Sequence, residues 1–197
     1  MSNSNIAKCR WSDRTSKADI VVFDLDGTLI ETDLANFLSY EAAINHIIGH
    51  CPPVQLDSTK RITRKILKEM LPTAQRTLIE DIVEHKERIY GQFLHTTSVN
   101  QSLLWLLELA QGKDVILATD CRRARAELVL SYHGLWEKFT RKYFCDNDNP
   151  NSKYERIFAD LDINSRQVVV FENDPLLVTA AIEAGADANS VFLVCNS

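Results

Sequence analysis

Short runs of apolar residues alternate along the chain with longer segments in which apolar residues recur at helical spacing. The runs are continuous and rich in β-branched or aromatic residues, which is typical of strands buried on both faces of a sheet. The predicted strands are 20–23, 115–118, 143–145, 168–171 and 191–194. Helical segments at about 122–132, 152–161 and 175–184 separate the later strands, and Gly185 is expected to end the last helix. This alternation predicts an α/β fold with a doubly wound parallel sheet.

A long stretch without a strand pattern separates the first two predicted strands. Its expected helices are at about 33–49, 58–71, 74–95 and 99–111, and the prolines of "CPP" at 51–53 interrupt them. A single crossover between parallel strands needs far fewer residues. We therefore expect an α/β core domain made of residues 1–32 and 98–197, with a helical domain inserted at 33–97. The helix at 99–111 is the expected crossover.

Two further expectations concern residues around this core. The first eighteen residues are mostly polar and are expected to form a loose arm. Trp105 lies among leucines in the crossover helix, so we expect its side chain in the core. Cys121 follows the second predicted strand and is expected to act as a small core filler.

The composition narrows the class of protein. Hydrophobic residues make up 45% of the chain and charged residues 25%, which is typical of a globular protein. The net charge of −5 gives no basic field for a nucleic-acid backbone, so no nucleic-acid partner is expected. No apolar run is long enough for a membrane span, and the first residues lack the apolar segment of a signal peptide. Five cysteines without a C-x-x-C spacing favour a reduced, cytoplasmic protein.

Polar residues gather at the carboxyl ends of the predicted strands, the edge at which open α/β sheets bind ligands. Asp24 and Asp26 follow the first strand, and Thr119 and Asp120 follow the second. Lys153 lies in the segment after the third strand, and the acidic stretch "END" follows the fourth. Acids, a hydroxyl and an amine that converge on one edge indicate a candidate active site.

The first pair of carboxylates needs a partner. Asp24 and Asp26 are two residues apart, so an extended chain directs both side chains to the same side. At about 5 Å and an effective dielectric constant of about 20, two such charges repel by roughly 3 kcal/mol. A bound divalent cation such as Mg²⁺, or one protonated carboxyl, would relieve this repulsion. A protonated Asp26 would be a general acid, and Asp24 could attack phosphorus to form an aspartyl-phosphate.

The residues "DLDGTLIET" at 24–32 resemble the first motif, D-x-D-G-T-L, of the haloacid dehalogenase-like (HAD) superfamily of phosphohydrolases. "VILAT" resembles the second motif, Lys153 matches the lysine of the third, and "VVVFENDPLLVTAAIEAGAD" resembles the fourth with its following helix. The resemblance covers nearly the whole chain. It implies a HAD-like Rossmannoid core, and the insertion after the first strand is similar to the C1-type helical cap of the phosphoglycolate phosphatase and β-phosphoglucomutase group.

The resemblance also implies a role for each matching residue. Asp24 would be the nucleophile and a Mg²⁺ ligand, and Asp26 the general acid/base with its backbone carbonyl on the metal. Thr119 would hold the phosphoryl oxygens, and Lys153 would neutralise their charge. The expected site residues are Asp24 and Asp26 for catalysis, Thr119, Asp120 and Lys153 for the substrate phosphate, and Asp24, Asp26, Asn173 and Asp174 for the metal.

Two positions depart from the family pattern. Asn173 stands at a metal-ligand position where Asp is usual; an amide oxygen suits Mg²⁺ but removes one negative charge. Asp174 could substitute, although Asp before Pro is also a typical helix N-cap. Asp120 follows the motif threonine and could repel a phosphate, unless it points away or pairs with Arg122 or Arg123.

These features predict a Mg²⁺-dependent phosphatase that hydrolyses a small phosphomonoester through an aspartyl-phosphate. One alternative is a phosphomutase that uses the same residues. Another is a catalytically weakened protein that binds phosphate or has a regulatory role. A dehalogenase is disfavoured because that branch does not need the second aspartate. The expected partner is a small phosphorylated metabolite; the sequence distinguishes neither its identity nor a monomer from a homodimer.

Overall fold

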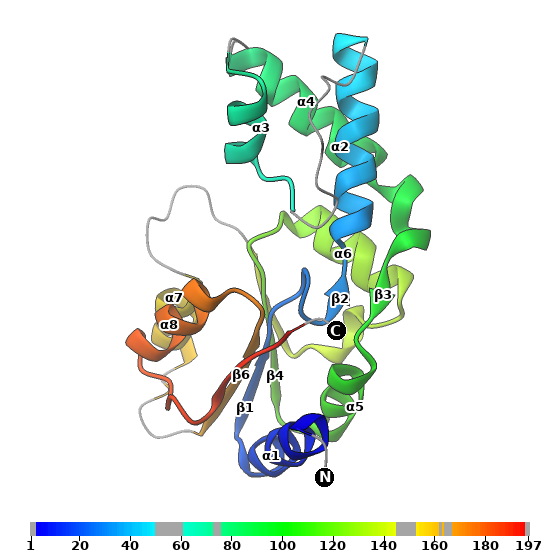
Figure 1. Ribbon diagram of the computed structural model, residues 1–197. Coiled ribbons are helices and arrows are strands. Elements are labelled where there is room, and N and C mark those ends of the chain that lie inside the picture. The colour runs from blue at the N-terminus through cyan, green and yellow to red at the C-terminus, as the bar shows by residue number, and fades with distance from the viewer. Residues whose placement is uncertain are drawn as a thin grey trace. The chain divides into compact units, whose positions relative to one another are not determined.

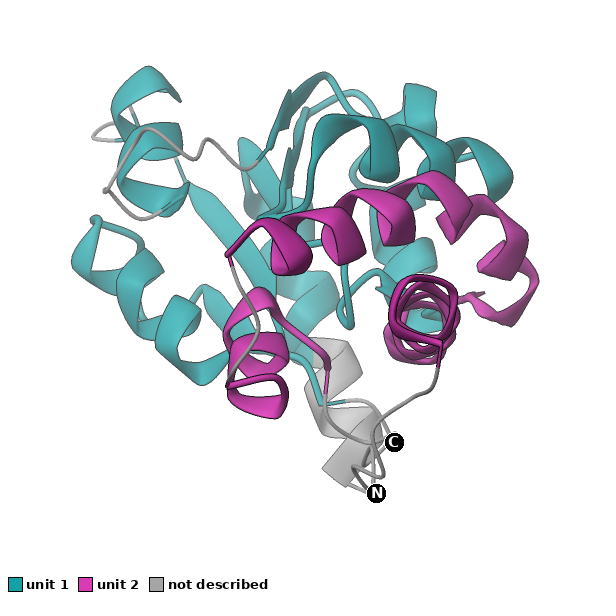
Figure 2. Ribbon diagram, turned by 90° about the horizontal axis from the view of Figure 1, so that it is seen from above, with its two compact units in different colours: residues 1–30, 99–197 teal, residues 31–98 magenta. Residues whose placement is uncertain are grey.

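The computed structural model describes residues 3–49, 61–72, 76–144, 153–161, 163 and 167–195, and the side chains from residue 10 onward within them. The chain forms two compact units, one made of residues 1–30 and 99–197 and the other of residues 31–98 (Figure 2). Within the described residues, no helix combines the length and the apolar character needed to cross a bilayer.

The larger unit contains a five-stranded sheet in the order β5-β4-β1-β6-β7, and every neighbouring pair is parallel. Its strands are β1 (Ile20–Phe23), β4 (Asp114–Ala118), β5 (Arg141–Tyr143), β6 (Val168–Glu172) and β7 (Val191–Leu193). The central β1 pairs with β4 on one side and β6 on the other, with Ile20 opposite both Asp114 and Val168. The predicted parallel α/β sheet is therefore confirmed. Because the strand order reverses beside β1, the carboxyl ends of β1 and β6 form a crevice at which ligands bind in such sheets.

Helices cover both faces of this sheet (Figure 1). The connections from β1 to β4 and from β4 to β5 contain α5 and α6, which lie on one face of the sheet. The connections from β5 to β6 and from β6 to β7 run in the opposite direction and place α7 and α8 on the other face. Their bounds are α5 (Gln101–Leu109), α6 (Arg123–Tyr132), α7 (Lys153–Leu161) and α8 (Pro175–Glu183). A short 3-10 helix, η2 (Trp136–Lys138), precedes β5.

The strand predicted at 143–145 was placed too late. The structure has β5 at Arg141–Tyr143, and residue 145 lies outside the described residues. β5 pairs only with β4, so it is an edge strand, where charged residues such as Arg141 and Lys142 are tolerated. The sequence pattern therefore missed Arg141 and Lys142 of this strand.

The predicted loose arm at the start of the chain is wrong. Residues Asn3–Lys17 form helix α1, and its Trp11 packs edge-on against Phe171, with ring centroids 5.6 Å apart. Trp11 also contacts Phe192 at 6.1 Å between centroids, on the neighbouring strand. Thr15 and Ala18 are buried beneath the same segment. The polar composition of α1 explains why the sequence pattern did not indicate this helix.

The smaller unit is helical and has a hydrophobic core of its own. Its elements are α2 (Asp33–Ile48), α3 (Arg64–Met70), α4 (Arg76–Ile89) and the 3-10 helix η1 (Tyr90–Thr96). The helix predicted at 58–71 begins only at Arg64 within the described residues, because Thr63 caps it by accepting the N–H of Ile66 at 3.2 Å. The strands β2 (Ile30–Glu31) and β3 (Ser98–Val99) pair with each other where the chain passes between the units. A cap function for residues 33–97 stays a prediction.

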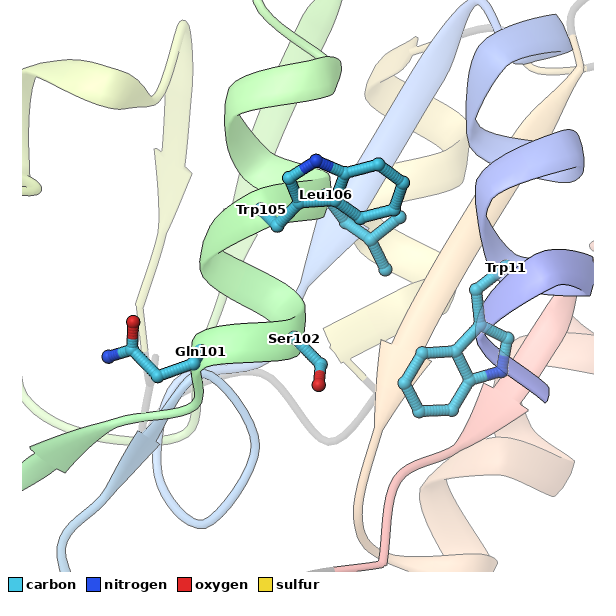
Figure 3. A pocket seen from close by; sticks show the side chains of 5 residues that line it. All are labelled: Trp11, Gln101, Ser102, Trp105 and Leu106. Atoms are coloured by element: carbon cyan, nitrogen blue, oxygen red, sulfur yellow. The ribbon is translucent and has the colours of Figure 1, made fainter. Parts of the chain in front are cut away.

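Trp105 is not the core residue that the sequence indicated. Its side chain is 51% exposed and lies beside a cavity of about 250 Å³. Figure 3 shows the indole rings of Trp11 and Trp105, which come from α1 and α5, among the residues that line this cavity. The helical spacing of the leucines around Trp105 was right, but Trp105 itself falls on the outer side of the helix.

The two tryptophans give a matched test of α1. We expect Trp11→Ala to lower the free energy of unfolding by about 2–4 kcal/mol, because it removes a large side chain packed on the sheet. Trp105→Ala removes a side chain of the same size from a half-exposed position and should change that free energy by less than about 1 kcal/mol. Chemical denaturation monitored by circular dichroism measures both values. Equal values for the two variants would contradict the packing role of α1.

Candidate active site

Asp24 is the first residue after β1 and its side chain is buried. Both oxygens of its carboxylate are held by hydrogen bonds. The Thr28 hydroxyl donates to Oδ2 at 2.8 Å, and the Lys153 ammonium donates to Oδ1 at 2.7 Å. The backbone N–H of Asp24 donates to the carbonyl of Phe171 at 3.0 Å, which continues the pairing between β1 and β6. Asp24 therefore has a fixed orientation at the crevice between these strands.

Lys153 begins α7 and its side chain is also buried. Its Nζ lies 2.7 Å from Asp24 Oδ1, 2.7 Å from Glu172 Oε2 and 3.3 Å from the carbonyl oxygen of Ala118. Asp24 directly follows β1, and Glu172 and Ala118 are the last residues of β6 and β4. One ammonium group thus joins the carboxyl ends of three neighbouring strands, as the sequence predicted for the position of Lys153.

Glu172, the last residue of β6, belongs to the stretch "END" that the sequence placed at this edge, but no role was assigned to it; it is 1% exposed at the centre of the site. Its Oε1 accepts the backbone N–H groups of Asn173 at 2.9 Å and Asp174 at 3.1 Å. Its Oε2 accepts the hydroxyl of Tyr154 at 2.7 Å. The signal was present in "VVVFE", where a carboxylate continues a fully apolar strand, a placement that requires a buried partner.

Burial and charge together set the protonation of this cluster. Burial raises the pKa of Asp24 from its ordinary 3.8 to about 6; Lys153 opposes this rise and the charge of Glu172 adds to it. Burial alone would lower the pKa of Lys153, but the charges of Asp24 and Glu172 outweigh it and raise that pKa above its usual range. Two carboxylates therefore share one ammonium, and the cluster carries an excess negative charge when all three groups are ionised.

The loop after β1 passes close to Asn173. Gly27 has φ +76°, and a Cβ atom built on it would lie 2.3 Å from the Asn173 Nδ2 atom, so a side chain at position 27 would be both strained and blocked. This close approach brings the amide of Asn173 beside the loop that carries Asp24 and Asp26. The described residues contain no group of three or more His, Cys, Asp or Glu side chains placed to hold a metal ion. An amide oxygen and a backbone carbonyl, which suit Mg²⁺, would have to complete such a set.

Asp174 has another use in the structure. Its side chain is exposed and accepts the N–H of Leu176 at 2.8 Å, which caps α8 with Pro175 at the first helical position. This is the helix-capping alternative that the sequence left open. A metal-ligand role for Asp174 stays a prediction.

Asp26 lies beside Arg125 of α6, with its Oδ2 3.5 Å from the guanidinium, and both side chains are 12% exposed. No sequence pattern predicted this ion pair. Asp120 is exposed, and among these described residues it forms no ion pair with Arg122 or Arg123. The predicted contact of Asp120 with a substrate phosphate stays a prediction.

Thr119 follows β4 and is buried. Its Oγ1 accepts the backbone N–H of Cys121 at 3.1 Å, which fixes the turn next to the carbonyl that Lys153 contacts. Burial, reinforced by the charge of Asp26, raises the pKa of the Cys121 thiol to about 12. Cys121 is therefore a protonated and buried filler, as the sequence indicated, and not a reactive thiolate.

The sequence model of the haloacid dehalogenase-like hydrolases matches residues 21–191, which span every residue of this site. The chain belongs to the haloacid dehalogenase-like hydrolase family. The family predicted from the motifs is thus confirmed, and with it the assignment to an enzyme family. No curated protein matches this HAD-like chain in a sequence comparison.

Solved structures share the HAD fold of this chain. CbbY from Rhodobacter sphaeroides, in complex with phosphate, has a TM-score of 0.70 and 17% identity, over 86% of this chain and 84% of that one. A proposed phosphatase from Clostridium difficile has a TM-score of 0.68 and 22% identity, over 87% and 83%. A proposed β-phosphoglucomutase from Thermotoga maritima has a TM-score of 0.62 and 22% identity, over 91% and 86%. At these identities the likeness concerns the fold.

The raised pKa of Asp24 means that the ionised carboxylate destabilises the folded, metal-free HAD-like protein, whereas the protonated carboxyl does not. The folded protein holds the Asp24 proton more tightly than the unfolded chain does. The stability that comes from protonating Asp24 is therefore complete below pH 3.8 and is lost as the pH rises through about 6. Asp24→Asn cannot titrate. In EDTA at pH 7.5 we expect it to be more stable than the wild type by roughly 1–3 kcal/mol, with a smaller difference at pH 5.

Thermal unfolding at the two pH values measures this difference. The exposed Asp81→Asn in the smaller unit is the control and should leave the two melting temperatures close to those of the wild type. An Asp24→Asn variant that melts below the wild type at pH 7.5 would show that the ionised carboxylate stabilises the fold.

Proposed function

We propose that this HAD-like protein is a phosphatase that hydrolyses a small phosphomonoester in a Mg²⁺-dependent reaction through an aspartyl-phosphate on Asp24. The observation that carries this proposal is the buried Asp24 carboxylate, held on one oxygen by Thr28 and on the other by Lys153. A nucleophile needs such a fixed orientation, because correct placement supplies much of the rate in phosphoryl transfer. The phosphate bound to CbbY, a neighbour of the same fold, supports a phosphorylated substrate.

The residues present fit a magnesium ion. The excess negative charge of the Asp24, Glu172 and Lys153 cluster favours a cation, and Gly27 leaves room for the amide of Asn173 beside the first loop. The carboxylate of Asp24, the backbone carbonyl of Asp26 and the side chain of Asn173 would hold the ion, with Asp174 as the alternative to Asn173. Bound Mg²⁺ would neutralise charge on the phosphate and on the attacking carboxylate.

The chain's own residues supply the remaining steps. A carboxylate oxygen of Asp24 attacks phosphorus, and the bond from phosphorus to the ester oxygen breaks. Asp26 gives a proton to that departing oxygen and the alcohol leaves. Asp26 then takes a proton from a water molecule, whose oxygen attacks the phosphorus of the aspartyl-phosphate, so that inorganic phosphate forms and Asp24 is regenerated. Lys153 and Thr119 hold the phosphoryl oxygens in both steps.

Two other functions use the same residues. A phosphomutase would pass the phosphoryl group from Asp24 to another hydroxyl instead of to water, and the fold neighbour from Thermotoga maritima bears the name of such an enzyme. A protein that binds phosphate without turnover is the third possibility, because Asn173 supplies one negative charge fewer than Asp would. We favour the phosphatase, with a small phosphorylated metabolite as its substrate.

Release of inorganic phosphate tests the proposal. We expect the wild type to release phosphate from p-nitrophenyl phosphate and from some members of a panel of phosphomonoesters with Mg²⁺, and not with EDTA. Asp24→Asn should lower the rate by about 10³-fold or more, because it removes the nucleophile. Asp81→Asn should retain the wild-type rate. Phosphate binding without release by the wild type would instead favour a mutase or a regulatory protein.

Changing the charge at Asn173 and at Asp174 distinguishes which of these two residues after β6 binds the metal. Asn173→Asp restores a carboxylate, so we expect it to lower the Mg²⁺ concentration for half-maximal activity by about tenfold. Asp174→Asn keeps an oxygen that can cap α8 and should leave that concentration within about twofold. Magnesium titration of phosphate release, or of protein melting where turnover is slow, measures both. The reverse result would assign the metal to Asp174.

A further inference from the structure

The Lys153 ammonium has no spare hydrogen in this structure. An ammonium group carries three N–H donors. Asp24, Glu172 and the carbonyl of Ala118 provide three acceptors, at 2.7, 2.7 and 3.3 Å from Nζ. If Lys153 is to contact a phosphoryl oxygen, it must therefore loosen one of these three interactions. How tightly each acceptor holds Nζ then decides how readily the lysine turns to a phosphate.

Glu172 is the acceptor whose hold on Lys153 is shared with another group. Its Oε1 is occupied by the N–H groups of Asn173 and Asp174, which keep the carboxylate at the end of β6. Its Oε2 faces both Lys153 Nζ and the hydroxyl of Tyr154, each at 2.7 Å. A second donor on one carboxylate oxygen withdraws electron density from the bond to the first. The Tyr154 hydroxyl therefore weakens the attraction between Glu172 and Lys153.

Tyr154 belongs to the hydrophobic core beside the sheet, and its hydroxyl is placed on Glu172. It directly follows Lys153 in the first turn of α7 and is fully buried, and its ring centroid lies 5.2 Å from Nζ. Within the described part of the chain its hydroxyl donates to Glu172 and not to Asp24 or the Ala118 carbonyl, so the hydroxyl acts on Lys153 through Glu172. No sequence motif pointed to it.

We propose that Tyr154 is a positioning residue that sets how Lys153 is divided between Glu172 and a bound phosphoryl group. With the hydroxyl in place, Glu172 releases part of its hold and the ammonium turns to the phosphoryl oxygens beside Asp24. Without it, Oε2 has only the ammonium as a strong donor and retains it. This inference rests on the proposed phosphoryl chemistry at Asp24, and it concerns a residue that the proposed reaction does not itself use.

Tyr154→Phe removes the hydroxyl and keeps the ring that packs near Nζ. We expect binding of inorganic phosphate in the presence of Mg²⁺, measured by isothermal titration calorimetry, to weaken about tenfold, as for loss of one hydrogen bond to a charged group. Hydrolysis of p-nitrophenyl phosphate should lose more in kcat than it changes in KM, because the charge that Lys153 neutralises grows in the transition state.

Tyr143→Phe is the matched control. The Tyr143 hydroxyl also donates to a carboxylate, that of Asp160, but this pair lies on the exposed side of α7 and β5. Its removal should leave phosphate binding and kcat within about twofold of the wild type. A further variant, Glu172→Gln, tests the route: because the hydroxyl acts through Glu172, adding Tyr154→Phe to Glu172→Gln should change phosphate binding less than twofold.

Each outcome decides between the two proposals. Phosphate binding that weakens in Tyr154→Phe, without turnover of any phosphomonoester by the wild type, would support the positioning role and overturn the phosphatase. Turnover by the wild type with unchanged phosphate binding and kcat in Tyr154→Phe would overturn the positioning role alone. A full additional loss in the Glu172→Gln background would overturn the route through Glu172. A wild type that neither binds phosphate nor hydrolyses phosphomonoesters would overturn both.

Discussion

The buried ammonium of Lys153 is the interaction on which the site depends. It lies within 2.7 Å of two carboxylates that come from neighbouring strands, Asp24 after β1 and Glu172 at the end of β6. Either carboxylate would be costly to bury without a cation, because an unpaired charge in the interior loses its hydration. The lysine thus makes possible the buried carboxylate cluster on which the proposed metal and phosphate binding rests. The same ammonium group therefore compensates the buried charges and takes part in the proposed reaction.

Much of the fold was predictable because its signals are local. The strands β1, β4 and β6 are short apolar runs, and a strand buried on both faces has no polar side to confuse the pattern. The edge strand β7 is also an apolar run. The elements that were missed or shifted have a polar composition. Helix α1 is mostly polar although its Trp11 packs on the sheet, and the edge strand β5 begins with two charged residues. Trp105 was misplaced for the related reason that hydrophobicity alone does not say which side of a helix a residue occupies.

The site residues also fall into those that the sequence predicted and those that only the structure showed. Asp24 and Lys153 were predictable because motif residues at strand ends must meet when parallel strands pair. Glu172, Tyr154 and Arg125 were not predicted, because their importance comes from partners far away in the sequence. Arg125 and Asp26, for example, are 99 residues apart. A lone tyrosine beside an apolar segment carries no mark of the carboxylate that it will contact. A glutamate that continues an apolar strand indicates a buried partner but does not say which residue that partner is. The family resemblance supplied roles for residues in motifs, and the contacts around those motifs came only from the structure.

The order in which the chain is made has a consequence for this arrangement. Asp24 is synthesised early, whereas Lys153, Glu172 and the Phe171 ring that receives Trp11 of α1 follow more than a hundred residues later, and Phe192 comes last. Until then the first strand has neither its neighbour β6 nor a cation for its carboxylate. A partly synthesised chain therefore presents an apolar strand without its partner, the kind of surface that chaperones bind and that aggregates. The larger unit is therefore completed only after β6 and β7 have been synthesised.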